Sequence, residues 1–145
     1  MRAIARTAVL GLFIASTSLA TPPDDELMPG LVGEYYSLEG QVQDFPAIAA
    51  EKKPTLRRVD KQINWDATSE KFAGTDLDEH FYVRWTGLIR IPKDGNYTFF
   101  LESDDGSRLS LGGKQIIDNG GLHAMEEKSG DISRRSRCGG GGTWR

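Results

Sequence analysis

The stretch that decides the fold runs from Phe81 to Leu111 and reads FYVRWTGLIRIPKDGNYTFFLESDDGSRLSL. Apolar residues alternate with polar ones over residues 81–91, 97–101 and 108–111. A period of two residues is typical of strands that have one buried face and one solvated face. The turn sequences KDGN and DDGS separate these runs, and both suit a reversal of the chain. The stretch therefore predicts three strands in an antiparallel meander, with the adjacent carboxylates of Asp104 and Asp105 at one tip.

A longer run, WTGLIRIPKDGNYTFFLESDDGSRLSLGGKQIIDN over residues 85–119, resembles the PA14 domain. This β-sandwich module occurs in bacterial toxins, glycosidases, yeast surface adhesins and many secreted bacterial proteins. The segment GLVGEYYSL, residues 30–38, is similar to the first strand of the family. The resemblance covers residues 30 to about 132 and implies an all-β fold, an antiparallel β-sandwich.

The N-terminus has the pattern of a secretory signal peptide over residues 1–20. Arg2 and Arg6 precede an apolar run at residues 8–15, and Ser18 and Ala20 place small residues where a signal peptidase reads them. The apolar run is shorter than the roughly 20 residues that a spanning helix needs. The sequence therefore predicts export to an extracytoplasmic location (periplasm, cell surface or medium) with no membrane span after cleavage, followed by a linker at residues 21–29.

The charge distribution argues against nucleic acid as a partner. All 21 acidic residues lie between Asp24 and Asp131, a span that holds 12 of the 18 basic residues, so the central region has a balance of −9. Such a surface would repel phosphates. The single cysteine, Cys138, excludes a disulfide within the chain.

The last residues differ sharply in composition from the rest. Residues 133–145 combine arginines with a run of four glycines and show no alternation, which is typical of a disordered tail. The PA14 resemblance implies further strands and a second binding loop after residue 132. We therefore expect an incomplete sandwich and interpret the chain as a truncated or frameshifted form of a longer protein.

Outside the decisive stretch the pattern is weaker. A short strand is predicted around Ile63 and Trp65, a strand at residues 114–118 after the Gly112-Gly113 turn, and a weak strand at residues 127–132. Residues 47–53 are interpreted as a loop that could include a short helix.

Asp104 and Asp105 are the foremost candidate site. Calcium prefers 6 to 8 oxygen ligands, and neighbouring carboxylates on a turn can supply two of them. In the sugar-binding PA14 adhesins, the paired aspartates are joined by a cis peptide bond and hold calcium, which in turn accepts vicinal sugar hydroxyls. The resemblance thus implies Asp104 and Asp105 as calcium ligands and as glycan-binding residues. Asp-Asp-Gly-Ser is also good turn chemistry without any metal, so both interpretations remain open.

Asp118 and Asn119 are possible further oxygen ligands. Their place before Gly120-Gly121 also fits the end of a strand. We keep Asn119 as a candidate ligand-binding residue. His80 and His123 have no second histidine or cysteine at metal-ligand spacing, so we interpret them as surface or turn residues.

The sequence contains no catalytic motif of the nucleophile-elbow, phosphate-loop or zinc-protease type. We expect a protein that is not an enzyme. The first hypothesis is an exported PA14-type module that binds glycans or extracellular polysaccharide, with calcium as a possible cofactor. The alternative is a non-catalytic structural or interaction domain of a larger secreted or cell-surface protein.

Overall fold

A computed structural model describes residues 27–66, 70–135 and 143–144 of the 145-residue chain. The predicted signal peptide and most of the linker lie outside the described residues. The elements, in chain order, are β1 Leu31–Ser37, β2 Leu56–Asp60, the 3-10 turn η2 Phe72–Gly74, β3 Phe81–Thr86, β4 Ile89–Arg90, β5 Gly95–Ser103, β6 Ser107–Leu111, β7 Lys114–Asn119, β8 Glu126–Arg134 and β9 Thr143–Trp144. In the described part of the chain, no helix has the length and apolarity needed to cross a bilayer.

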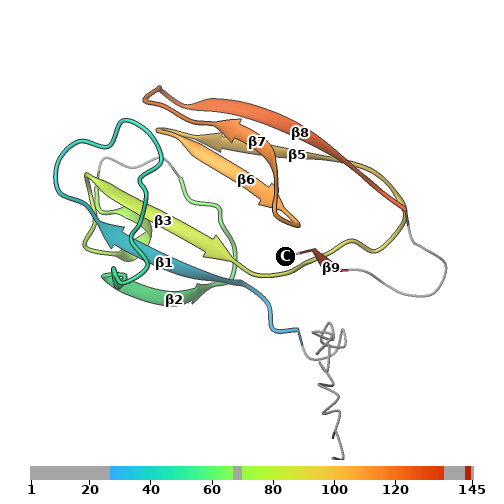
Figure 1. The fold of residues 1–145 in the computed structure, drawn as a ribbon, viewed down its shortest axis with the longest axis horizontal. Coiled ribbons are helices and arrows are strands. Elements are labelled where there is room, and N and C mark those ends of the chain that lie inside the picture. Colours follow the sequence, from blue (N-terminus) through green and yellow to red (C-terminus); the bar gives the residue numbers. More distant parts are fainter. Residues whose placement is uncertain (1–26, 67–69, 136–142, 145) are drawn as a thin grey trace, which may run out of the picture.

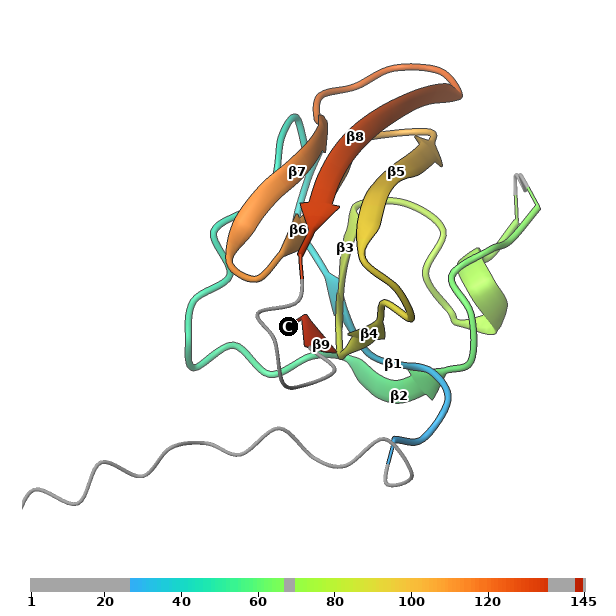
Figure 2. The ribbon, with the colours of Figure 1, turned by 90° about the vertical axis from the view of Figure 1, so that its right-hand side faces the viewer.

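The strands form two layers, and all of their pairings are antiparallel, which confirms the all-β prediction (Figure 1). One layer is a three-stranded sheet in the order β2-β1-β3. The other contains the pairs β5-β8 and β6-β7. A view at right angles shows β5, β7 and β8 stacked above β1 and β2 (Figure 2).

The predicted strands of the decisive stretch form, but their pairing differs from a meander. Residues 81–91 divide into β3, which pairs with β1, and β4, which pairs with β9. Strand β5 pairs with β8 rather than with its neighbour β6. The prediction of a meander was therefore wrong. A Gly-containing turn reverses the chain without specifying the partner strand, and in a sandwich the reversal can carry the chain to a different pair.

Other elements also differ from the sequence predictions. Strand β8 begins one residue before the predicted weak strand and ends at Arg134, inside the segment expected to be a disordered tail. Thr143–Trp144 in that same segment forms β9. Residues 61–66 contain no strand, and residues 47–53 contain no helix.

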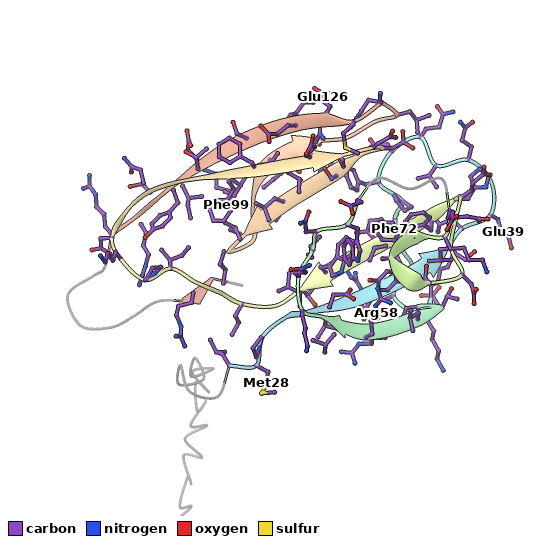
Figure 3. The ribbon with its side chains drawn as sticks, turned by 180° about the vertical axis from the view of Figure 1, so that it is seen from behind. Met28, Glu39, Arg58, Phe72, Phe99 and Glu126 are labelled. Carbon is purple, nitrogen blue, oxygen red and sulfur yellow. The ribbon has the colours of Figure 1, made fainter. Side chains whose placement is uncertain are left out.

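An aromatic cluster packs beside the three-stranded sheet. Trp85 of β3 stacks on Trp65 at a centroid distance of 5.6 Å and meets Tyr35 of β1 edge-on at 6.0 Å. Phe72 of η2 packs on Phe81 at 5.0 Å and on Trp65 at 5.3 Å. Figure 3 shows Phe72 beside the sheet strands rather than pointing away from them. Trp65 thus packs half-buried in this cluster, although no strand carries it there.

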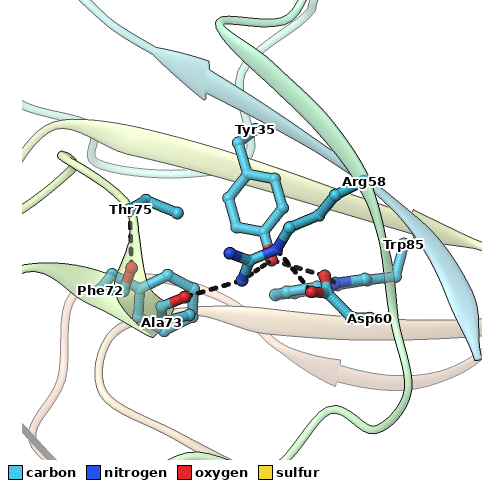
Figure 4. A network of polar contacts seen from close by, with 7 residues as sticks. All are labelled: Tyr35, Arg58, Asp60, Phe72, Ala73, Thr75 and Trp85. Atoms are coloured by element: carbon cyan, nitrogen blue, oxygen red, sulfur yellow. Dashed lines mark hydrogen bonds and ion pairs between the residues drawn. The ribbon is translucent and has the colours of Figure 1, made fainter.

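A polar network connects the three strands of this sheet (Figure 4). The Asp60 carboxylate is 7% exposed and accepts hydrogen bonds from Tyr35 Oη at 2.5 Å, Arg58 Nε at 2.6 Å and Trp85 Nε1 at 2.7 Å. Arg58 Nη2 donates to Tyr35 Oη at 2.9 Å and to the Ala73 carbonyl of η2 at 2.7 Å. The network therefore fastens the η2 segment to the sheet as well as β1, β2 and β3 to one another.

Candidate functional site

The aspartate turn consists of Asp104, Asp105 and Gly106, between β5 and β6. All three residues are exposed, and the peptide bond that joins the two aspartates is cis. The cis bond is the geometry that the PA14 resemblance implies. Both candidate aspartates are thus exposed. The turn between β5 and β6 lies at one end of the layer that contains β5, β6, β7 and β8, the upper layer in Figure 1.

The base of the aspartate turn is held by uncharged groups. Ser103 Oγ and Ser107 Oγ lie 2.6 Å apart across the turn. Asn119 Nδ2 donates to Ser103 Oγ at 3.1 Å and to the Glu126 carbonyl at 3.1 Å. A single amide side chain therefore links the ends of β5 and β7 to the start of β8.

Asn119 itself is fully buried, at 0% exposure. Its Oδ1 is buried too and has no hydrogen-bond partner among the described residues. The sequence predicted Asn119 as a ligand-binding residue. Its observed contacts are those of a positioning residue behind the aspartate turn, and a direct contact with ligand would require movement of the surrounding loop.

Close backbone packing fixes the other side of the turn. A Cβ atom on Gly106 would lie 3.0 Å from the Gly121 carbonyl oxygen, 3.1 Å from Gly121 N and 3.3 Å from Gly120 Cα. A Cβ atom at position 106 could be accommodated only if the Gly120-Gly121 backbone moved by a few tenths of an ångström. The aspartate turn therefore rests directly on the Gly120-Gly121 segment.

His123 contributes a contact that the sequence did not predict. Its backbone N–H donates to Asp105 Oδ1 at 3.2 Å. Its ring nitrogens face two carbonyl oxygens, Nδ1 that of Ala124 at 2.8 Å and Nε2 that of Asn119 at 3.1 Å. Since carbonyls only accept hydrogen bonds, only the doubly protonated ring satisfies both. The carbonyls of Ala124 and Asn119 accordingly raise the pKa of His123 above its ordinary value. No sequence motif predicts the contact between His123 and Asp105, because the two residues are brought together only by the fold.

The two aspartates differ from nearby acids in their electrostatic partners. Asp118 forms an ion pair with Arg108 at 3.2 Å and accepts a hydrogen bond from Gln115 Nε2 at 3.0 Å. Desolvation would raise the pKa of Asp118, but the hydrogen bond and charge of Arg108, together with hydrogen bonds from Gln115 and the Gly120 backbone, hold the pKa below its ordinary value. In the part of the chain that the structure describes, no lysine or arginine forms such a pair with Asp104 or Asp105. Adjacent, exposed and uncompensated carboxylates are suited to a cation.

The aspartate turn offers calcium the right kind of ligand atom but too few of them. Two carboxylates supply hard oxygens of the preferred type. Within residues 27–66, 70–135 and 143–144, however, no group of three or more His, Cys, Asp or Glu side chains is arranged to hold a metal. A calcium ion bound here would therefore need backbone oxygens, water or a ligand to complete its coordination.

The comparisons with known proteins agree with this architecture. The sequence model of the PA14 domain matches residues 27–143, which includes most of the segment expected to be a tail. Anti-sigma-I factor RsgI3 of Acetivibrio thermocellus is 32% identical over 106 residues, an alignment that covers 71% of this chain and 14% of that protein. A solved structure described as an anti-sigma factor domain-containing protein superposes with a TM-score of 0.62 at 25% identity, and the match covers 81% of this chain and 36% of that one. The chain thus spans only a small part of the length of these relatives. With a match over most of its length and both aspartates displayed on the expected turn, the chain belongs to the PA14 domain family.

Proposed function

We propose that this chain is an exported, non-catalytic recognition module that binds glycans at the aspartate turn with the help of calcium. The observation that carries the proposal is the pair of exposed carboxylates at Asp104 and Asp105, which have no basic partner among the described side chains. Two adjacent negative charges without compensation repel one another, and a divalent cation relieves that repulsion.

The turn alone supplies too few oxygen atoms to complete the coordination of a calcium ion. Calcium prefers 6 to 8 oxygen ligands, and the turn supplies two carboxylates. A sugar with vicinal hydroxyl groups offers the neutral oxygens that are still needed. Calcium alone should therefore bind weakly, in the roughly 10⁻⁴–10⁻³ M range of extracellular modules, and the sugar should strengthen its binding by linkage.

The test is a calcium titration by calorimetry, followed by a glycan array read in calcium and in EDTA. The full chain is compared with the double variant Asp104→Asn and Asp105→Asn. The matched control is Asp76→Asn with Asp78→Asn, which removes the same charge from another exposed segment. We expect the first variant to lose calcium heat and glycan signal and the control to keep both. Equal titrations of the wild type and the aspartate-turn variant would refute the proposal.

A second candidate function is that of a structural or interaction domain within a longer protein. Two observations favour it: the matched relatives are much longer than this chain, and Asp105 already accepts the His123 N–H as an ordinary turn residue would. In that case the aspartate-turn variant should change neither calcium heat nor glycan binding.

An extracytoplasmic location is part of the proposal. It is supported by the signal-peptide pattern of residues 1–20 and by the presence of PA14 domains in secreted proteins. Mass spectrometry of the chain expressed with its natural N-terminus should find a mature form that begins at Thr21 in the exported fraction. Retention of Met1 in the cytoplasmic fraction would contradict this assignment.

A further inference from the structure

A polar cavity lies beside the aspartate turn. Its volume is about 410 Å³, within the roughly 300–1,000 Å³ range of small-molecule sites. Gln43 and Asp44, from the loop after β1, line it together with Arg108, Asp118 and Lys128, from β6, β7 and β8. This loop and the turns after β5 and β7 lie at the same end of the molecule (Figure 1).

The lining of the cavity is charged but balanced. Its charged groups are two carboxylates, those of Asp44 and Asp118, and two cationic groups, those of Arg108 and Lys128. Arg108 is already paired with Asp118, and Lys128 is 3.7 Å from Glu126. Such a lining gives no net attraction to a free cation or anion, and the absence of apolar side chains among the lining residues disfavours a lipid or an aromatic ligand. It offers both hydrogen-bond donors and hydrogen-bond acceptors, which suits a ligand that is rich in hydroxyl groups.

Arg108 is held in position before any ligand arrives. Its guanidinium carbon lies 4.1 Å from the centre of the Phe45 ring, and its Nη2 lies 3.2 Å from both Asp118 carboxylate oxygens. A stacked and paired guanidinium loses little conformational entropy when it binds, so it can contribute efficiently to affinity.

The cavity and the aspartate turn share one wall, the Gly120-Gly121 segment. On the cavity side, a Cβ on Gly120 would lie 3.1 Å from Asp118 Oδ1 and 3.4 Å from Asp44 Oδ1. On the other side, the same segment carries Gly106 of the aspartate turn. A Cβ on Gly120 would also lie 3.2 Å from Phe45 Cε2, so side chains cover that residue. A Cβ on Gly121 would meet no atom within 4 Å, so a ligand at the turn can continue into the cavity past Gly121.

We infer that this cavity is a second saccharide subsite, which binds one uncharged sugar unit next to the unit held at the aspartate turn. The inference rests on the proposed function and specifies its ligand class: a neutral oligosaccharide of at least two units rather than a single terminal sugar.

The experiment uses the ¹⁵N-labelled full chain and six probes: glucose, galactose, mannose, and the pentasaccharides cellopentaose, galactopentaose and mannopentaose, each in calcium and in EDTA. We expect at least one pentasaccharide to bind at least about tenfold more tightly than its monosaccharide and to shift the amide signals of Gly120, Gly121 and the Gln43 side chain. The double variant Asp44→Ala with Lys128→Ala should remove this advantage and leave the calcium titration unchanged. The control, Lys71→Ala with Asp76→Ala, deletes an exposed ion pair outside the cavity and should keep it.

The outcomes separate this inference from the proposed function. Calcium-dependent binding with equal affinities for monosaccharide and pentasaccharide, and with shifts only at residues 104–106, would overturn the subsite and leave the proposed function standing. Pentasaccharide shifts at the cavity that are the same in EDTA and in the Asp104→Asn, Asp105→Asn variant would support the subsite and refute the role of the turn. If none of the six probes shifts any signal, both are refuted.

Discussion

Two ion pairs of equal length but different burial allow the effect of burial on stability to be tested separately from the effect of distance. Arg58 Nε lies 2.6 Å from Asp60, and Lys71 Nζ lies 2.6 Å from Asp76. The Asp60 side chain is 6% exposed and the Asp76 side chain is 94% exposed. We predict that Asp60→Ala strongly destabilises the domain and that Asp76→Ala does not, because water screens the exposed pair.

The magnitude follows from the groups that Asp60→Ala would leave without a partner. Removing one member of a buried ion pair costs about 3–5 kcal/mol. Arg58 remains 30% exposed and keeps its bonds to Tyr35 and Ala73, which favours the lower end. The Trp85 indole N–H, in contrast, loses the acceptor that it has in the structure. We therefore expect a loss of about 3 kcal/mol, which lowers the melting temperature of a domain of this size by about 12 °C.

The pH dependence supplies a second, independent readout. Burial tends to raise the pKa of Asp60, but hydrogen bonds from Tyr35, Trp85 and Arg58 together with the charge of Arg58 lower it below 3.8. A carboxyl whose folded pKa is depressed stabilises the fold fully above its unfolded pKa, and the stabilisation disappears as pH falls through the folded pKa. The stability difference between wild type and Asp60→Ala should therefore be constant from about pH 5 to pH 7 and shrink below pH 3.8.

Chemical denaturation of both variants and the wild type, monitored by tryptophan fluorescence, measures the difference. Trp85 and Trp65 stack beside the network, so their emission reports directly on this sheet. The reasoning fails if Asp76→Ala costs as much as Asp60→Ala. It also fails if Asp60→Ala costs less than about 1 kcal/mol, the size of one ordinary hydrogen bond.

Three further predictions concern the upper layer. Gly130→Ala should cost about 2–3 kcal/mol in urea denaturation, because its Cβ would clash with the Ile116 backbone carbonyl, which cannot move aside. Gly106→Ala should weaken calcium binding in calorimetry and lower stability by about 1 kcal/mol, because its Cβ would lie 3.0 Å from the Gly121 carbonyl; an unchanged titration would show that the turn tolerates displacement. His123 should titrate above 6.5 by NMR, and since its folded pKa is raised, its stabilisation is present below pH 6.5 and is lost as pH rises through the folded pKa; His123→Gln should lack this step in a plot of melting temperature against pH.

The sequence predicted those strands whose buried face is apolar. Alternation located β5 and β6, where Tyr97, Phe99 and Leu101 are more buried than the residues between them. It missed β2, and the structure shows why: this strand buries the charged Asp60 at 7% exposure and exposes the apolar Val59 at 60%. A pattern of hydropathy cannot reveal a strand whose inward side chain is a carboxylate, because its burial depends on hydrogen bonds from distant residues.

The sequence predicted the aspartate turn itself but not the residues that support it. Asp104 and Asp105 stand in a local turn signature, so their exposure at a reversal of the chain could be predicted from neighbouring residues alone. The supports of the turn come from elsewhere, with Asn119 16 residues and His123 18 residues from the groups that they contact. Such contacts depend on β5 and β6 belonging to different strand pairs, which no local pattern specifies.

The two polar centres of the domain use opposite means of holding a carboxylate, and the difference bears on function. Asp60 is enclosed by three donors, one of them cationic, so its charge is satisfied within the fold and is unavailable to a ligand. The aspartate turn is instead supported by a serine pair, a buried amide and close glycine packing, none of which neutralises its charges. A turn fixed by neutral groups keeps its shape while its carboxylates remain free to respond to a cation, which is the property that a preorganised binding site requires. For that reason replacing Asn119 by alanine should impair calcium binding through the shape of the turn, whereas replacing Asp104 and Asp105 by asparagine should impair it through charge alone and leave the fold intact.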